Sequence, residues 1–293
     1  MPKANVNGTI LHYHVHGRGT PIVFIHPPLL NRAVFRYQEV QLADLFRVVT
    51  FDIRGHGFSA PSEAPITYRL IAEDVKGLLD VLNIRTAYLC GYSTGAGAAV
   101  ETMLAFPDRI RGAVLVGAML DAEAPLLRLS LSLASGMAAS GMKTTLALAF
   151  ALGNADMKET FRNLYYDAVR GDPRNWRQYF DASKSWSAMD RLGAVKAPAL
   201  LVYGARDYRF LAHAERIRKR LPDATLAFIP EAKHGIPIKA AGALHDVMTK
   251  WILRRELAAA ERGETYADRA WLKKAEETDL RIPDGVLAEE DRL

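Results

Sequence analysis

A serine between two glycines is the first group in this chain whose type and setting could do chemistry. Gly91-Tyr92-Ser93-Thr94-Gly95 follows an apolar run and precedes a stretch of small residues with helical spacing, 96–106. A Gly-x-Ser-x-Gly turn between a strand and a helix projects the serine hydroxyl above the sheet, and its glycines permit the close backbone approach. The same five-residue pattern also occurs by chance as an ordinary turn. The strand-to-helix setting favours chemistry, so we expect Ser93 to be a nucleophile.

A serine hydroxyl needs a base to activate it, and the base needs a third group to hold it. Asp207 follows the apolar run 199–202, and His234 follows the next run, 226–229. The order serine, aspartate, histidine along the chain is the order expected when a nucleophile elbow belongs to a Ser-His-Asp triad. Parallel strands would bring all three strand ends to one edge of a sheet. We therefore predict a catalytic triad of Ser93, Asp207 and His234.

The elements that must position these groups can be read from hydrophobic patterning. Short apolar runs of the kind buried on both faces of a parallel sheet recur along the chain, at 21–25, 47–51, 87–90, 113–116, 199–202 and 226–229, after an alternating segment at 9–15. Helical spacing fills most of the intervals, as in the leucine-rich stripe of 68–82. Strands that alternate with helices predict an α/β fold with a mostly parallel central sheet and helices on both faces.

The alternation stops between 121 and 186, which is rich in leucine, alanine, serine and methionine and then in aromatic residues. We interpret this block as a helical cap over the carboxyl edge of the sheet, where open α/β sheets bind ligands. The predicted core comprises residues 1–120 and 187–256. Residues 257–293 form a charged C-terminal extension, with an extended last stretch around Pro283, to which we assign no chemistry.

With these motifs in hand, the chain resembles the α/β-hydrolase superfamily from residue 9 to about residue 255. The segment Asp52-Ile53-Arg54-Gly55-His56-Gly57-Phe58-Ser59 is similar to the structural loop that follows an early strand in that family. The resemblance implies that Ser93 attacks a carbonyl, His234 transfers the proton and Asp207 orients the imidazole. It also implies an alternative position for the acid, which Asp121 occupies here; we favour Asp207.

The chain departs from the family pattern in the loop that helps to form the oxyanion hole. The resemblance implies that the residue two past a histidine donates its backbone N–H, but in His26-Pro27-Pro28-Leu29-Leu30 that residue is Pro28, which has no N–H. We expect one donor at Thr94, the residue after the nucleophile. The second donor is Leu29 through a shifted loop, or a side chain, or it is missing.

These observations favour a serine hydrolase that cleaves a carboxylic ester, lactone or thioester of an apolar or aromatic substrate. The expected substrate contacts are Pro28, Leu29, Tyr92, Trp176 and Trp186. Three alternatives stay open. The same triad could hydrolyse a carbon–carbon bond, the scaffold could serve a slow or non-catalytic ligand-binding or signalling protein, or the His-Asp pair could support cofactor-free oxygenase chemistry.

Composition limits the kinds of partner that we expect for this chain and the cellular compartment in which we expect it. The chain is 49% hydrophobic, and its net charge of +5 is spread along the sequence. The one basic run, 216–220, suits a solvated helix face, so we expect no nucleic-acid partner. Cys90 is the only cysteine, which excludes an intrachain disulfide. With no secretory leader at the N-terminus and no apolar run long enough to span a bilayer, we expect a cytoplasmic protein that acts on small molecules. A homodimer is left open.

No cofactor or metal is expected, because a Ser-His-Asp site supplies its own nucleophile and base. Three alternating histidines on the early strand, His12, His14 and His16, could suggest a metal site. They lie far from the predicted catalytic edge, and we interpret them as solvated strand positions.

Overall fold

The computed structural model describes residues 2–264, 269–282 and 285–288. Within this part of the chain, eight strands form one sheet in the order β1-β2-β4-β3-β5-β6-β7-β8. Their bounds are β1 (Lys3–Val6), β2 (Thr9–His16), β3 (Thr20–Ile25), β4 (Phe46–Phe51), β5 (Ala87–Tyr92), β6 (Ile110–Val116), β7 (Ala199–Gly204) and β8 (Ala224–Ile229). The pairs β1–β2 and β2–β4 are antiparallel and the other pairs are parallel. The predicted fold class is confirmed, and the carboxyl ends of β3 to β8 share one edge.

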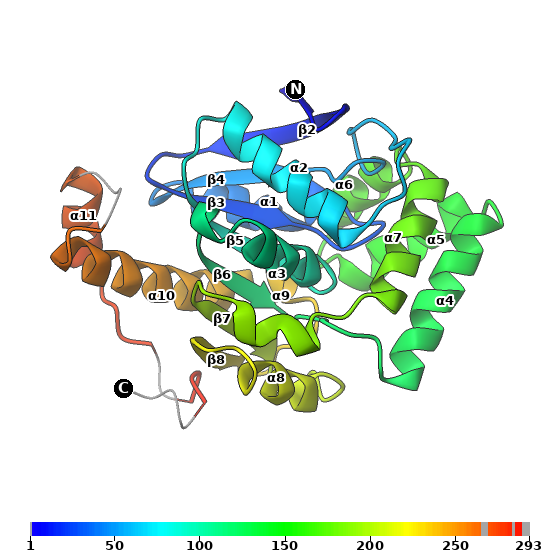
Figure 1. Ribbon diagram of the computed structural model, residues 1–293. Coiled ribbons are helices and arrows are strands. Elements are labelled where there is room, and N and C mark those ends of the chain that lie inside the picture. The colour runs from blue at the N-terminus through cyan, green and yellow to red at the C-terminus, as the bar shows by residue number, and fades with distance from the viewer. Residues whose placement is uncertain (1, 265–268, 283–284, 289–293) are drawn as a thin grey trace.

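Helices cover both faces of the sheet, which is why the inner strands are apolar on both sides (Figure 1). One face carries α2 (Tyr68–Val81), α3 (Gly95–Ala105) and α8 (Leu211–Arg218). The other carries α1 (Arg36–Gln41), α9 (Ile236–Lys239) and α10 (Ala241–Glu261). In α2 the predicted stripe is buried, and the Thr67 hydroxyl accepts from the Leu70 N–H at 3.0 Å, which begins the helix.

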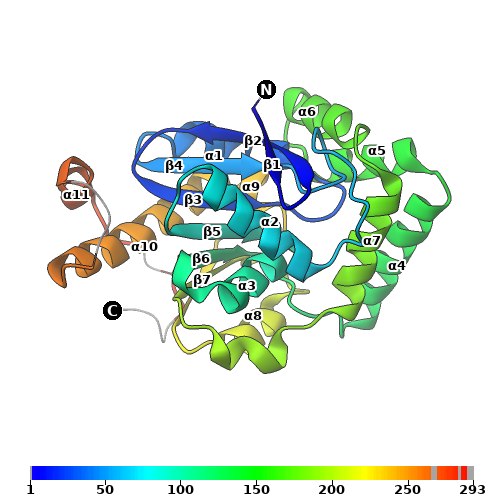
Figure 2. The ribbon, with the colours of Figure 1, turned by 45° about the horizontal axis from the view of Figure 1, so that its top comes forward.

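Four further helices lie between β6 and β7 and gather beyond the carboxyl edge of the sheet (Figure 2). They are α4 (Pro125–Ala139), α5 (Lys143–Asn154), α6 (Lys158–Ala168) and α7 (Pro173–Ser185). We call them the cap layer. Helices α4 and α7 pack together around a small apolar cluster that includes Leu131 and Phe180. Short 3₁₀ helices also connect these elements: η1 (Arg32–Phe35), η2 (Pro107–Arg109) and η3 (Met189–Ala194).

The described part of the C-terminal segment packs against the core, whereas the sequence suggested an appendage. Helix α10 continues past residue 256 to Glu261, and α11 (Arg269–Glu276) follows. The Trp271 ring lies edge-on to Phe46 at 6.1 Å and its Nε1–H donates to the Leu45 carbonyl. Residues 285–288 pair with β8, where the Ala288 N–H donates to the Leu226 carbonyl at 2.9 Å. Apolar side chains in a charged segment therefore complete the core.

Pro283 and the other residues between and beyond these stretches lie outside the described part of the chain. Among the described helices, none combines the length and the apolar character that a bilayer crossing requires.

Candidate active site

Ser93 occupies a strained turn at the end of β5, where the chain enters α3. Its φ of +54° lies in the left-handed region, which L-residues rarely adopt. The neighbouring glycines make the turn possible: a Cβ on Gly95 would lie 2.3 Å from the Ile25 carbonyl oxygen, and one on Gly91 would lie 2.5 Å from the Cα of Ala96. The Ser93 N–H donates to the Val116 carbonyl at 2.8 Å, which ties the turn to β6.

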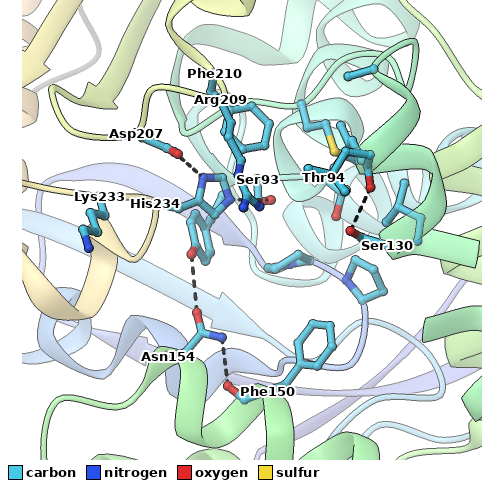
Figure 3. A pocket seen from close by; sticks show the side chains of 18 of the residues that line it. Ser93, Thr94, Ser130, Phe150, Asn154, Asp207, Arg209, Phe210, Lys233 and His234 are labelled. Atoms are coloured by element: carbon cyan, nitrogen blue, oxygen red, sulfur yellow. Dashed lines mark hydrogen bonds and ion pairs between the residues drawn. The ribbon is translucent and has the colours of Figure 1, made fainter. Parts of the chain in front are cut away.

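The three residues of the predicted triad form one hydrogen-bonded chain (Figure 3). Nε2 of His234 lies 3.0 Å from Oγ of Ser93, and Nδ1 lies 2.8 Å from Oδ2 of Asp207. Asp207 follows β7 and His234 follows β8, so the parallel sheet brings both to the edge above β5. With the proton on Nδ1, the imidazole donates to the carboxylate and accepts from the serine hydroxyl. The arrangement can therefore remove a proton from Ser93.

The histidine ring is held between two aromatic rings. Phe210 stacks on it with ring centres 4.8 Å apart, and Tyr92 lies on it at 5.5 Å. Gly117, with φ of +52°, leaves room for the ring, since a Cβ there would lie 3.0 Å from Cε1 of His234. Sequence reasoning missed Phe210 and Gly117. No periodic signal marks either one, because each matters only through a contact with a residue far away in the sequence.

The alternative acid, Asp121, serves other groups. Its carboxylate lies 3.4 Å from Nη2 of Arg216 and 3.8 Å from Nδ1 of His213. The hydrogen bond from the imidazole of His234 goes to Asp207. The base, His234, therefore contacts Asp207, the acid that the sequence favoured, and does not contact Asp121.

The proline-containing loop has its own organising hydrogen bonds. The buried His26 accepts from the Ile53 N–H through Nε2, and its Nδ1 lies 2.9 Å from the Pro27 carbonyl oxygen, to which it donates. Burial lowers the pKa of His26, which keeps its Nε2 available as an acceptor. Leu29 then adopts a φ of +70°. The backbone therefore enters the left-handed region at Leu29, the residue after Pro28.

Several backbone N–H groups near the nucleophile have no acceptor among the described residues. They include those of Leu29, in this loop, and of Thr94, the N-cap residue of α3. The positive end of the helix dipole favours negative charge at the Thr94 position. The sequence predicted Thr94 as one oxyanion donor and gave Leu29 as one of three options for the second, the others being a side chain or no donor.

A pocket of about 910 Å³ opens between the triad and the cap layer. Its walls are mainly apolar and include Pro28, Leu30, Met119, Leu127, Phe150 and Phe180. Tyr92 also lines it, with its hydroxyl 3.4 Å from Oδ1 of Asn154. The polar groups that line it include three cationic side chains, Arg206, Arg209 and Lys233. An apolar organic group with one polar, reactive centre fits such a lining.

Three of the expected substrate contacts are placed elsewhere. Trp176 is fully buried inside the cap layer, where Nζ of Lys143 lies 5.7 Å from its ring centre. Trp186 packs on Tyr68 at 4.3 Å and its Nε1–H donates to Glu101, beside a second, smaller cleft. The Leu29 side chain is buried in the cap cluster. Large aromatic residues in a small helical layer form its core, so the expectation for Trp176 and Trp186 was wrong.

The histidines of β2 are not a row of solvated residues, as the sequence suggested. His12 is fully buried and its Nδ1 lies 2.8 Å from Oδ2 of Asp52, to which it donates. The same carboxylate accepts from the Arg32 and Phe58 N–H groups. Of the other two, His14 is half-buried and only His16 is exposed. The interpretation failed because the loop that follows β4 covers His12, with the Phe58 ring centre 5.1 Å from its own, and because Glu39 of α1 lies beside His14.

Comparisons with known proteins agree with this architecture. The family model described as alpha/beta hydrolase fold matches residues 20–241. The human (Homo sapiens) serine hydrolase BPHL is 26% identical over 257 residues, which covers 82% of this chain and 81% of that protein. The solved enol-lactonase from Burkholderia xenovorans LB400 has 25% identity and a TM-score of 0.76, over 86% of this chain and 99% of that one. The esterase EaEST from Exiguobacterium antarcticum, at 18% identity, shares the fold with a TM-score of 0.77 over 85% of this chain and 98% of that one.

Proposed function

The chain belongs to the α/β-hydrolase fold family, and from that premise we propose that it hydrolyses a carboxylic ester, lactone or thioester through an acyl-enzyme on Ser93. The observation that carries the proposal is the hydrogen-bonded chain from Asp207 through His234 to Ser93, which opens into an apolar pocket. The likeness to an enol-lactonase agrees with this bond class.

In the proposed reaction, Oγ of Ser93 attacks the substrate carbonyl carbon while Nε2 of His234 takes the hydroxyl proton. Asp207 stabilises the imidazolium that forms. When the tetrahedral intermediate collapses, the bond to the leaving oxygen or sulfur breaks, and His234 returns the proton to that atom. A water molecule then attacks the acyl-enzyme, His234 accepts its proton, and the acid is released with the Ser93 hydroxyl restored.

We assign the oxyanion to the N–H groups of Thr94 and Leu29. Both lack acceptors among the described residues, and Leu29 stands immediately after the proline that cannot donate. Donors that are fixed in place before the reaction stabilise charge in the transition state, and each is worth roughly 3–4 kcal/mol. On this proposal, the left-handed backbone conformation of Leu29 is strained because it positions the N–H that binds the oxyanion.

The proposed substrate carries an apolar acyl or alcohol group. The walls that support this assignment come from the loop containing Pro28 and from α4, α5 and α7 of the cap layer. Residues 121–186 would then act as a cap that sets substrate size and excludes water. Pro28 and Tyr92 remain the expected contacts near the reacting centre.

The test is covalent labelling with a fluorophosphonate combined with ester turnover. We expect the wild-type protein to be labelled at Ser93, to hydrolyse p-nitrophenyl esters and to release a burst of nitrophenol. Ser93→Ala should lose label and turnover together, whereas Ser130→Ala, a serine of the same pocket that does not contact His234, should keep both.

Two outcomes would overturn the proposal. An unlabelled wild-type protein whose ligand affinity is unchanged by Ser93→Ala would indicate a binding protein. Turnover that survives Ser93→Ala would indicate chemistry by the His-Asp pair without an acyl-enzyme.

A further inference from the structure

A second group of chemically active side chains lies away from the triad, where β2 passes beneath α1. His14 and His16 are two residues apart on β2 and therefore share one face of the strand. Glu39 lies on α1, which covers that face. One nitrogen from each imidazole and one carboxylate oxygen of Glu39 all lie within 4.8 Å of one another. The proposed function makes no use of this group.

Two buried polar atoms of the group lack hydrogen-bond partners among the described residues. Glu39 is 1% exposed, and its Oε1 accepts from Nη1 of Arg32 at 2.8 Å and from the Thr50 hydroxyl. Its Oε2 has no hydrogen bond, and the ion pair to Nη1 of Arg36 is 3.7 Å long. Nε2 of His14 is buried and also has no partner. Buried polar atoms are normally satisfied, so a carboxylate oxygen and an imidazole nitrogen left without partners in one group point to a shared ligand.

The two imidazoles lie near the spacing that a metal chelate requires. Their ring centres lie 5.8 Å apart. Two imidazoles bound to one tetrahedral zinc ion, with Zn–N distances of 2.0–2.1 Å, place their ring centres about 5 Å apart and their ligand nitrogens about 3.4 Å apart. The exposed His16 can rotate to close the remaining gap, because little packs around it.

The chemistry of the donors selects the kind of ion. Two imidazoles with one carboxylate suit Zn²⁺ and its neighbours Ni²⁺ and Cu²⁺, whereas Mg²⁺ and Ca²⁺ prefer sets made only of oxygen. The Arg32 charge weakens the binding of any cation, which places the expected affinity below that of a structural zinc site.

We propose that His14, His16 and Glu39 form a binding site for a zinc-class divalent ion that ties β2 to α1. The helix that would be tied down follows η1 and the loop from His26 to Asn31, so the ion would stabilise the segment that leads out of the proposed oxyanion loop.

The experiment measures thermal unfolding and zinc binding with tag-free protein that has been treated with EDTA. Zinc in about tenfold excess over its dissociation constant should raise Tm by several degrees and bind as a single ion per chain in calorimetry. Magnesium should leave Tm unchanged. Fluorophosphonate labelling of Ser93 reports the separate proposed function and should be the same with and without zinc.

Variants distinguish the three-ligand site from a surface histidine pair. His16→Ala, at an exposed position, should weaken zinc binding at least tenfold with little change in the Tm of the metal-free protein. Glu39→Gln should weaken zinc binding to a similar extent. Ile10→Ala, an exposed change on the same strand, is the matched control and should bind zinc normally.

The proposal fails if zinc leaves the wild-type Tm unchanged. It also fails if the zinc-induced shift persists in His16→Ala, or if Glu39→Gln binds zinc as tightly as the wild type.

Discussion

At the scale of single residues, the proposed chemistry depends on which carboxylate holds the base. Asp207 and Asp121 each follow a strand that ends at the catalytic edge, and both are buried. Only Asp207 contacts Nδ1 of His234, while the carboxylate of Asp121 is paired with Arg216. Replacing either aspartate by asparagine removes one negative charge, so the Asp121 variant is a matched control for the proposed acid, Asp207.

We expect Asp207→Asn to lower kcat by about 10³–10⁴-fold, because an amide facing Nδ1 favours the wrong tautomer and does not stabilise the imidazolium. Asp121→Asn should leave kcat within about threefold of the wild type, since it alters a pair that does not touch His234. Steady-state hydrolysis of an apolar p-nitrophenyl ester measures both. Equal losses in the two variants would contradict the assignment of Asp207.

At the scale of elements, the glycines of the strand-to-helix turn and of the cap layer have different roles. Gly95 begins α3 in contact with the backbone of β3, whereas Gly136 lies on the exposed face of α4 with open space around it. The same substitution should therefore have opposite effects on stability in the two helices.

Gly136→Ala should stabilise the protein by about 0.5–1 kcal/mol, because alanine restricts the unfolded chain and favours the helix. Gly95→Ala should destabilise it and abolish labelling of Ser93, since the new Cβ would lie 2.3 Å from the Ile25 carbonyl oxygen, which belongs to the backbone. Thermal melts and labelling are the measurements. A Gly95→Ala protein with wild-type Tm would show that α3 can shift without cost.

At the scale of the whole molecule, the C-terminal segment completes the core. Trp271 of α11 is 7% exposed and packs on Phe46 of β4, and residues 285–288 pair with β8. The proposed site lies at the carboxyl edge, under the cap layer, while α10 and α11 extend away from it (Figure 2). Stability and catalysis should therefore respond separately to changes in the C-terminal segment.

Trp271→Ala should destabilise the protein by about 3–5 kcal/mol, the range for removing a large buried aromatic ring. Labelling of Ser93 at low temperature should be unchanged. Leu129→Ala, at an exposed position of the cap layer, is the control and should change stability by less than about 0.5 kcal/mol. Chemical denaturation provides both values. A Trp271→Ala protein as stable as the control would contradict the packing of α11 on the core.

Buried neutral histidines make the whole fold sensitive to acid. Burial, followed by the electrostatic effect of the neighbouring His26, lowers the pKa of His56 to about 3, so the folded protein keeps this ring neutral where the unfolded chain protonates it. The unfolded state then binds more protons between pH 6.5 and pH 3, and stability falls as the pH falls through that window, by about 1.4 kcal/mol per pH unit for each such group.

His56→Asn, which can still donate to the Arg54 carbonyl, should flatten the loss of stability between pH 6.5 and pH 4. Asp167 acts in the opposite sense, because burial raises its pKa to about 6 and favours the protonated, folded form at lower pH. The test is therefore the difference in the free energy of unfolding between wild type and variant, measured by denaturation at each pH. Parallel curves would show that His56 does not titrate on unfolding.

Local pattern was sufficient for the order of elements and for the candidate triad. The apolar runs, the Gly-x-Ser-x-Gly turn and the positions of Asp207 and His234 after their strands are all short-range features, and parallel pairing brings strand ends together once the strands exist. The carboxyl edge of the sheet therefore follows from the sequence by itself.

Tertiary structure decided what covers each side chain. The sequence could not show that Trp176 is buried inside the cap layer, that the loop after β4 covers His12, or that Trp271 completes the core. These outcomes depend on contacts between segments that are far apart in the sequence. Burial of a side chain is set by those contacts and not by its residue type. For the same reason, the left-handed turn at Leu29 became visible only when the loop around Pro28 was seen in its place.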